Sequence, residues 1–257
     1  MRIEPIRGGL ASALLLLAHA VSGAAQELTV AAASDLQAAL PAIAAAFETQ
    51  TGRRVAVTYG SSGNFFAQIQ NGAPFDLFLS ADLDYPKRLE RGGLVERGTL
   101  VEYARGRIVV WTRRDSGIDI ARGLRALVDP KVRKISIANP DHAPYGRAAL
   151  AALRAERVEE QVRGKLVTGE NISQAAQFAQ SGSADAGIIA LSLALSPSLK
   201  SSGVYVAVPD ASYPPIQQAA VVIASSRQKA LARQFVESLK SPAIVKLLDA
   251  YGFAAPR

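Results

Sequence analysis

Short apolar segments alternate along this chain with longer segments whose apolar residues recur at helical spacing. The short segments have the length and composition of buried strands; they lie at 28–33, 55–59, 75–80, 108–112, 134–138, 186–190, 204–208 and 219–223. The longer segments predict helices at 36–48, after a turn at 60–64, at 85–91, at 148–157, from within 168–173 to 180, at 228–239 and at 242–251. This alternation is typical of an α/β protein with an open, mostly parallel sheet.

Four of the strand-to-helix junctions carry small or hydroxyl-bearing residues. They lie at Ser34, Ser62, Tyr145 and Ile172. In open α/β sheets, ligands bind beyond the carboxyl ends of the strands, where such junctions gather. Two junctions belong to the first part of the chain and two to the middle, so we expect a ligand cleft between two domains.

The turn at 60–64, with the sequence Gly-Ser-Ser-Gly-Asn, offers hydroxyls and backbone N–H groups but no cation. At the positive end of a helix, this combination predicts a neutral cradle for an anion. The alternative for this stretch alone is that Ser62 or Asn64 only caps the helix, since both residue types are preferred there. Ser34 has the same alternative, as the cap of the helix predicted at 36–48.

The first residues are typical of an exported protein. Arg2 and Arg7 precede an apolar run at 10–18, and small residues follow at 21–25. This order predicts a signal peptide at 1–25 that is cleaved after Ala25. The run is shorter than the ~20 residues of a membrane-spanning helix. We therefore expect the mature chain to be soluble and to lie outside the cytoplasm.

Composition excludes several classes of protein. The chain has no cysteine, so disulfides, thiolate metal sites and a cysteine nucleophile are impossible. An apolar fraction of 49% can supply the cores of two domains of roughly 100 residues each. The net charge of +7 comes from scattered Lys and Arg residues rather than from a basic block interleaved with aromatic residues. This pattern favours a mildly anion-attracting surface and no nucleic-acid binding.

The residues of common enzyme sites are missing. After position 25 the sequence has one histidine, His142, and Gly60-Ser61-Ser62-Gly63 misses the G-x-S-x-G elbow of a serine hydrolase by one residue. Neither G-x-G-x-x-G nor a Walker A motif is present, and no cluster has metal-ligand spacing. We interpret Asp82 and Asp84 as helix-capping residues. The pattern indicates an anion receptor and no enzyme.

Five motifs in order along the chain resemble the periplasmic molybdate-binding proteins of molybdate ABC importers. They are VAAASDL at 30–36, YGSSGNFFAQIQNGAPFDLFLSAD at 59–82, NPDHAPYGRAA at 139–149, GENISQA at 169–175 and YGF at 251–253. The resemblance spans essentially the whole mature chain. It implies a two-lobed, type II periplasmic-binding-protein fold, with mixed, mostly parallel sheets flanked by helices and a cleft between the lobes. Lobe I would comprise 26–106 and 217–257, lobe II would comprise 107–216, and the chain would cross twice between them.

The resemblance also implies a tetrahedral oxyanion held by neutral hydrogen bonds. The ligand contacts would be Ser34 and Ser62 from lobe I, with Tyr145 and the backbone N–H of Ile172 from lobe II. Secondary residues around them would be Asp35, Ser61, Gly63 and Asn171.

Two positions depart from the pattern of the family. Asp35 stands where some relatives have asparagine. A carboxylate would repel an oxyanion, so we expect only its backbone N–H to face the ligand. Ala190 stands where some relatives have a tyrosine, and Tyr145 is expected to replace that hydroxyl. Whether Tyr145 acts through its hydroxyl or its backbone stays open at this point. Trp111 is expected in the core.

The function that the resemblance implies is the solute-binding component of a molybdate importer. It would bind molybdate, and tungstate, as a monomer without a cofactor and deliver it to an inner-membrane ABC permease. Three alternatives stay open: a receptor for sulfate or another oxyanion, a secreted serine hydrolase that uses Ser62 and His142, and the effector domain of a transcription regulator. The predicted signal peptide and the missing DNA-binding motif argue against the last.

Overall fold

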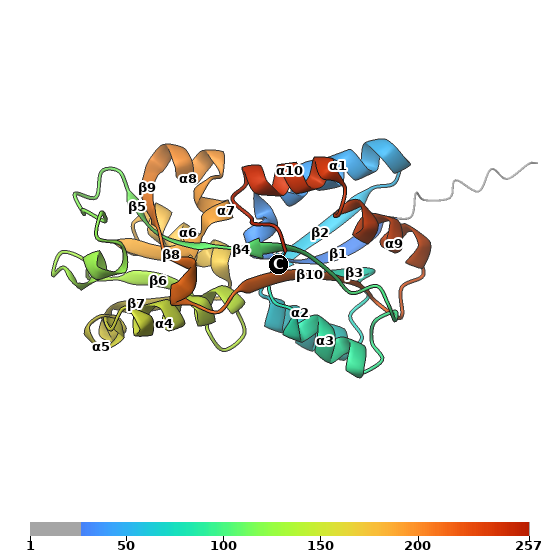
Figure 1. The fold of residues 1–257 in the computed structure, drawn as a ribbon, viewed down its shortest axis with the longest axis horizontal. Coiled ribbons are helices and arrows are strands. Elements are labelled where there is room, and N and C mark those ends of the chain that lie inside the picture. The colour runs from blue at the N-terminus through green and yellow to red at the C-terminus, as the bar shows by residue number, and fades with distance from the viewer. Residues whose placement is uncertain (1–26, 257) are drawn as a thin grey trace, which may run out of the picture.

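Two five-stranded mixed sheets lie side by side (Figure 1). The computed structural model describes residues 27–256, so the predicted signal peptide lies outside the described residues. The first sheet has the order β2 (Val55–Gly60), β1 (Leu28–Ala33), β3 (Leu77–Ser80), β10 (Ile216–Val222) and β4 (Val101–Gly106). The second has the order β7 (Leu166–Gly169), β6 (Ile135–Ala138), β8 (Ala186–Ala190), β5 (Ile108–Arg113) and β9 (Gly203–Ala207).

Each sheet is parallel at one side and antiparallel at the other. β1 pairs in parallel with β2 and β3, whereas β10 runs antiparallel to β3 and β4. In the second sheet, β6 pairs in parallel with β7 and β8, and β5 runs antiparallel to β8 and β9. Because β1, β2 and β3 run in the same direction, their carboxyl ends meet at the edge of the first sheet that faces the second half.

Helices cover both faces of the first sheet (Figure 1). They are α1 (Leu40–Thr51), α2 (Ser62–Gln70), α3 (Asp84–Arg91), α9 (Lys229–Ser238) and α10 (Pro242–Ala250). On one face, Phe47 of α1 packs edge-on against Phe235 of α9, with ring centroids 5.0 Å apart. On the other face, Phe65 and Phe66 of α2 join Leu89 of α3 in a second apolar cluster. Burial of these large side chains on two faces fixes the sheet between its helices.

The second sheet is enclosed by α4 (Pro144–Ala155), α5 (Glu159–Val162), α6 (Ile172–Ser181), α7 (Leu191–Ala194) and α8 (Pro197–Ser202). Trp111 on β5 is fully buried in the core of this half, as expected. Its indole packs where a Cβ at Gly203 would stand, so the neighbouring strand β9 needs glycine at that position.

The chain crosses between the halves twice, and the two crossings are adjacent. The first crossing joins β4 to β5 at Arg107, and the second runs from the end of β9 to the start of β10 through the 3-10 turn η4 (Asp210–Ser212). Gly106 and Ile216 pair directly in the antiparallel ladder of β4 and β10. The C-terminal segment lies beside the first crossing, because Arg105 and Ala254 exchange two backbone hydrogen bonds of 2.7 and 2.8 Å. The limits of the two lobes given above stay a prediction.

Two predicted helices differ from those observed. The helix expected at 36–48 is divided into the 3-10 turn η1 (Ser34–Gln37) and α1, and Ser34 makes no side-chain cap. The helix expected at 148–157 begins at Pro144, because proline is favoured in the first turn, where its missing N–H costs nothing. Tyr145 therefore lies on a helix and not in a turn.

Several short elements were not predicted. They are β4, β7, α5, α7, α8 and the 3-10 turns η2 (Gly123–Val128), η3 (Arg163–Lys165) and η4. In β4, Glu102 and Arg105 interrupt the apolar residues, so the strand carries no continuous hydrophobic run. Among residues 27–256, no helix has the length and apolarity that crossing a membrane requires.

Candidate functional site

A small pocket lies where the carboxyl ends of β1, β2 and β3 meet the first turns of α4 and α6. Its cavity volume is about 10 Å³, and it is lined by Ala33, Ser34, Asp35, Gly60, Ser61, Ser62, Ala81, Ala143, Pro144, Tyr145 and Ile172. The four residues singled out in the sequence, two from each half, all belong to this lining. The junctions thus meet at one place between the halves, and their contact with a ligand stays a prediction.

Ser62 lies in the first turn of α2, whose N-terminus points into the pocket region. The cap of α2 is neither Ser62 nor Asn64 but Ser61, whose hydroxyl accepts the N–H of Asn64 at 3.3 Å. Ser62 is fully buried, and its Oγ accepts the N–H of Ala81 at 2.9 Å. Because this bond uses an oxygen lone pair, the hydroxyl hydrogen of Ser62 is left to donate to a ligand.

Ser34 reaches across to the N-terminus of α6 in the other half. Its Oγ donates to Oδ1 of Asn171 at 3.1 Å and accepts the N–H of Ser173 at 3.3 Å. Asn171 is the cap of α6 and accepts the N–H groups of Ser173 and Gln174, both at 3.1 Å. Ile172 is the first residue of α6 and lines the pocket. Asn171 accepts none of its hydrogen bonds from the N–H of Ile172. The interpretation of Ser34 as a local helix cap is therefore wrong.

Tyr145 is buried in the first turn of α4. Its hydroxyl donates to Oδ2 of Asp35 at 2.9 Å. A Cβ at Gly106 would overlap this hydroxyl, so the side chain of Tyr145 extends to the chain crossing between the halves. The hydrogen of this hydroxyl is thus directed at Asp35, and the expected donation from Tyr145 to the ligand stays a prediction.

Asp35 is fully buried at the pocket, and its side chain has an asymmetric environment. Oδ2 accepts hydrogen bonds from Tyr145 and from Nε2 of Gln218, each at 2.9 Å. Oδ1 is the one buried side-chain oxygen or nitrogen among residues 27–256 that has no partner. Burial raises the pKa of this carboxyl to about 7, against the lowering effect of the hydrogen bonds from Tyr145 and Gln218.

Three residues around Asp35 were not identified from the sequence. Gln218 lies in the buried strand β10, Tyr103 donates to Oε1 of Gln218 at 3.4 Å, and Ser192 donates to the backbone oxygen of Asp35 at 2.7 Å. The available signal was the adjacent pair Gln217 and Gln218, two amide side chains before the apolar run of β10. Burial raises the pKa of both Tyr103 and Tyr145 well above the usual value, so these two phenols stay neutral.

Beside the pocket, further contacts join the two halves. The hydroxyl of Ser61 lies 2.9 Å from Nδ1 of His142, and the N–H of Gly63 donates to the backbone oxygen of His142 at 2.9 Å. Nearer the surface, Nδ2 of Asn64 donates to Oε1 of Glu170. His142 thus contacts Ser61 and not Ser62, so the pairing that a hydrolase based on Ser62 requires is not formed.

An ion pair also joins the two halves. Arg147 of α4 contacts Oδ2 of Asp82 at 2.6 Å, and its guanidinium lies 5.5 Å from the ring centroid of Tyr85. Asp82 also accepts the N–H of Tyr85 at 3.0 Å, which agrees with its predicted role at the start of α3.

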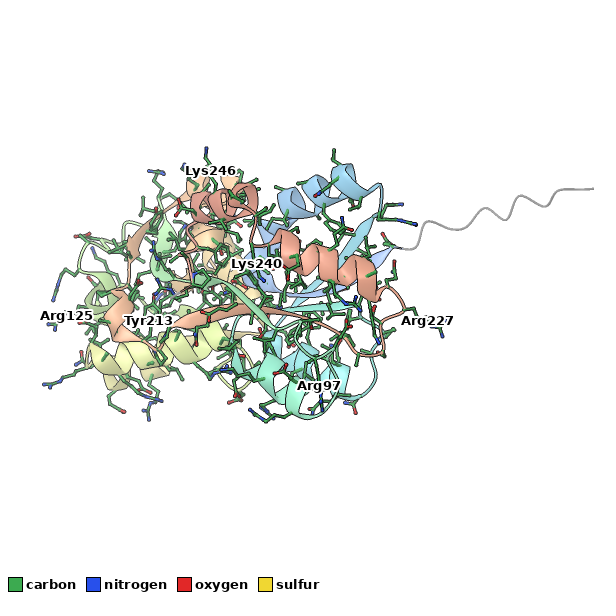
Figure 2. All side chains as sticks on the ribbon, turned by 45° about the vertical axis from the view of Figure 1, so that its right-hand side comes forward. Arg97, Arg125, Tyr213, Arg227, Lys240 and Lys246 are labelled. Carbon is green, nitrogen blue, oxygen red and sulfur yellow. The ribbon has the colours of Figure 1, made fainter. Side chains whose placement is uncertain are left out.

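The pocket itself has no cation. Neither Lys nor Arg lines it, and the basic side chains are spread over the surface; Arg125 and Arg227 project at opposite ends of the molecule (Figure 2). Among the described residues, no group of three or more His, Cys, Asp or Glu side chains could hold a metal ion. The site therefore offers hydroxyl and backbone donors at helix N-termini, which suit an anion rather than a metal cation.

Comparisons with known proteins agree with this architecture. Residues 28–254 match the family model of bacterial extracellular solute-binding proteins. The chain is 37% identical to the molybdate-binding protein ModA of Azotobacter vinelandii, over 91% of this chain and 92% of the relative. Identity to the ModA of Rhodobacter capsulatus is 34%, over 97% of each chain. The solved periplasmic molybdate-binding protein of Azotobacter vinelandii superposes with a TM-score of 0.84 and 34% identity, and the match covers 90% of this chain and all of that one. The chain therefore belongs to the bacterial extracellular solute-binding family and, within it, groups with the molybdate-binding proteins.

Proposed function

We propose that this protein is the solute-binding component of a molybdate importer. It binds molybdate, and tungstate, in the pocket between the halves and delivers the oxyanion to an inner-membrane ABC permease. The observation that carries the proposal is the meeting of Ser34, Ser62, Tyr145 and the N-terminus of α6 at one cation-free pocket. The 37% identity to a molybdate-binding protein over nearly the whole chain supports the choice of ligand.

The chemistry of the pocket suits a fully deprotonated oxyanion. Molybdate and tungstate are dianions near neutral pH and accept hydrogen bonds at all four oxygens. Inorganic phosphate still carries a proton near neutral pH, because HPO₄²⁻ loses its last proton only in strongly alkaline solution. The hydroxyl of Ser62 and the N–H of Ile172 donate, so a phosphate O–H that faces them is left unmatched, at a cost of ~1–3 kcal/mol. Sulfate has the same charge as molybdate, so only the size of the cavity separates these two ligands.

We further propose that the two halves are lobes that close over the ligand. Lobe I comprises 26–106 and 217–257, and lobe II comprises 107–216. The adjacent crossings at Arg107 and at 208–215 would form the hinge, as in other two-lobed receptors. The contacts of His142 with Ser61 and Gly63 join the lobes in the closed form. This closed form would dock on the permease.

After cleavage at Ala25, the protein would act in the periplasm as a monomer. It would carry no cofactor and catalyse no reaction. The molybdenum enters as an oxyanion held by hydrogen bonds, and not through side chains that coordinate the metal.

Calorimetric titration of residues 26–257 with molybdate tests the function, first alone and then with sulfate in large excess. We expect tight one-to-one binding that sulfate does not displace. A tungstate titration under the same conditions tests the second ligand. Absence of molybdate heat, or full displacement by sulfate, would reject the proposal and assign the pocket to another anion.

A further inference from the structure

The carboxyl of Asp35 is unfavourable in a receptor for dianions, because its ionised form repels them. It is fully buried and lines the pocket in which the proposed oxyanion would lie. Neither Lys nor Arg lines this pocket, so no positive charge there offsets a carboxylate. An ionised Asp35 beside a dianion would place like charges in contact away from water, which disfavours binding strongly.

The groups that face Asp35 are uncharged hydrogen-bond donors. Tyr145 of α4 and Gln218 of β10 both donate to Oδ2, and Ser192 of α7 donates to the backbone oxygen. Tyr103 of β4 adds a second phenol, hydrogen-bonded to Gln218. No neighbouring group can therefore stabilise a carboxylate in the way that an arginine or a lysine would.

The hydrogen-bond pattern assigns the position of a proton on Asp35. Oδ2 faces two donors, so a proton on that oxygen would oppose the hydrogens of Tyr145 and Gln218. Oδ1 has no partner among the described residues, and it is the oxygen on which a proton meets no other hydrogen. A proton on Oδ1 converts the group from a repelling anion into a donor for a ligand in the pocket that Asp35 lines.

We propose that Asp35 binds the oxyanion as a neutral carboxylic acid that donates a hydrogen bond from Oδ1, so that each oxyanion is taken up together with one proton. The proton comes from solvent and stays on Asp35, and no bond of the ligand forms or breaks. This inference rests on the proposed function and extends it, because the proton becomes a second ligand of the receptor. Tyr145 then acts as a positioning residue that orients Asp35.

The burial of Asp35 makes this protonation accessible near neutral pH. The pKa of the carboxyl is raised to about 7 before any dianion is present, and a dianion in the pocket raises it further. Below this pKa the acid is already formed and binding takes up few protons. Above it, binding has to protonate Asp35, and the affinity falls as the pH rises.

Calorimetry over a range of pH tests the inference. Residues 26–257 are titrated with molybdate at pH 6.5 to 9, in pairs of buffers that differ in ionisation enthalpy, which gives the number of protons taken up. We expect that number to rise toward about one at high pH while the affinity falls toward about tenfold per pH unit. The Asp35→Asn variant presents an amide donor that does not titrate, so its proton uptake and its pH dependence should vanish.

Two control variants identify the source of the proton. Asp141→Asn changes an exposed carboxylate two residues before Ala143 of the pocket lining, and His142→Gln removes the imidazole that contacts Ser61. Both should keep the proton uptake of the unmodified protein. Uptake that is lost in His142→Gln but kept in Asp35→Asn would overturn the assignment to Asp35.

The outcomes separate the inference from the function on which it rests. Molybdate binding with the same affinity and no proton uptake across this pH range would overturn the inference and leave the receptor function intact. No molybdate binding at any pH, in the unmodified protein and in Asp35→Asn alike, would overturn the function and the inference with it.

Discussion

The hydroxyl of Tyr145 lies 2.9 Å from Oδ2 of Asp35, across 110 residues of sequence and across the boundary between the halves. This bond links the first turn of α4 to the residue that follows the end of β1 by two positions. The separation of the halves would break it and expose a buried carboxyl to water. If the cleft opens and closes as proposed, this bond couples the ionisation of Asp35 to that closure.

Replacement of Asp35 with asparagine should change how stability depends on pH. In the folded protein the pKa of Asp35 is about 7, against an ordinary value of 3.8. Between these two values the folded state holds a proton that the unfolded state has released, so the unmodified protein loses stability as the pH rises. The amide that replaces the carboxyl does not titrate. The unfolding free energy of Asp35→Asn relative to the unmodified protein should therefore increase by up to about 4 kcal/mol from pH 4 to pH 8.

Denaturant unfolding without ligand, repeated across that pH range, checks this prediction. The difference between the two proteins cancels the titration of all other groups. A difference that stays constant with pH would show that Asp35 has an ordinary pKa in the folded state.

Ser62→Ala should weaken molybdate binding by ~1–3 kcal/mol, the range for a hydrogen bond to a charged partner. The hydroxyl is buried at the pocket, and its hydrogen is available to the ligand while its oxygen accepts from Ala81. Because the substitution also leaves that N–H without its acceptor, the melting temperature of the ligand-free variant is measured beside the affinity. Ser201→Ala, at an exposed serine of the other half, serves as the matched control. Unchanged affinity in Ser62→Ala would place the oxyanion elsewhere.

Gly63→Ala should oppose the closed arrangement of the halves. A Cβ at this position would lie 2.6 Å from the backbone oxygen of His142 and 2.7 Å from the hydroxyl of Tyr85, both too close for van der Waals contact. The first contact is made with the other half, so separation of the halves relieves it. We expect molybdate affinity to fall at least tenfold, or by about 1.4 kcal/mol.

Removal of the Tyr85 hydroxyl separates the two contacts. Gly63→Ala combined with Tyr85→Phe keeps only the overlap with His142, and it is compared with Tyr85→Phe alone. Gly164→Ala is the control, since no atom lies within 4 Å of a Cβ at that position. Equal affinities for the double variant and for Tyr85→Phe would contradict the role assigned to the contact between Gly63 and His142.

The ion pair of Asp82 and Arg147 should contribute modestly and in a salt-dependent way. The side chain of Arg147 is 43% exposed, so solvent screens the attraction despite the 2.6 Å distance. Asp82→Asn keeps an oxygen for the N–H of Tyr85 and removes the charge. We expect molybdate affinity to fall by ~1 kcal/mol or less in dilute buffer, and by a smaller amount in 0.5 M salt, about three times the physiological ionic strength.

A matched variant controls for the loss of a surface charge. Glu96 pairs with Arg233 at 2.6 Å, and both residues belong to the first half. Glu96→Gln should leave molybdate affinity unchanged, because closure of the cleft does not alter that pair. A larger loss of affinity in Glu96→Gln than in Asp82→Asn would contradict the contribution to binding assigned to the pair of Asp82 and Arg147.

The strands and the junctions that follow them could be predicted from the sequence, whereas most contacts within the pocket could not. Buried strands such as β1 and β8 are continuous apolar runs, so their positions and the junctions after them were readable. The start of α4 was misplaced although Pro144 marks a first helical turn, because the adjacent Pro140 and Gly146 favoured a loop.

The surroundings of Asp35 could not be predicted in the same way. Gln218 lies 183 positions away in sequence, and it reaches Asp35 only because β10 inserts between β3 and β4. The hydroxyl of Ser34 could equally have capped its own helix, and it instead contacts Asn171 of the other half. The hydrogen-bond partners of these side chains depend on how distant segments pack, and no local sequence pattern indicates that packing.

The place of β10 between β3 and β4 also constrains the order in which the chain can fold. The strands of the second sheet all come from one continuous stretch, 108–207, so that half can complete its sheet without the rest of the chain. The first sheet cannot, since β4 is joined to its neighbours only through residues 216–222. Almost the entire chain must therefore leave the ribosome or the translocon before the sheet that positions Ser34 and Ser62 is complete. A chain truncated before β10 would thus complete the second sheet but would lack the pocket proposed to bind the oxyanion.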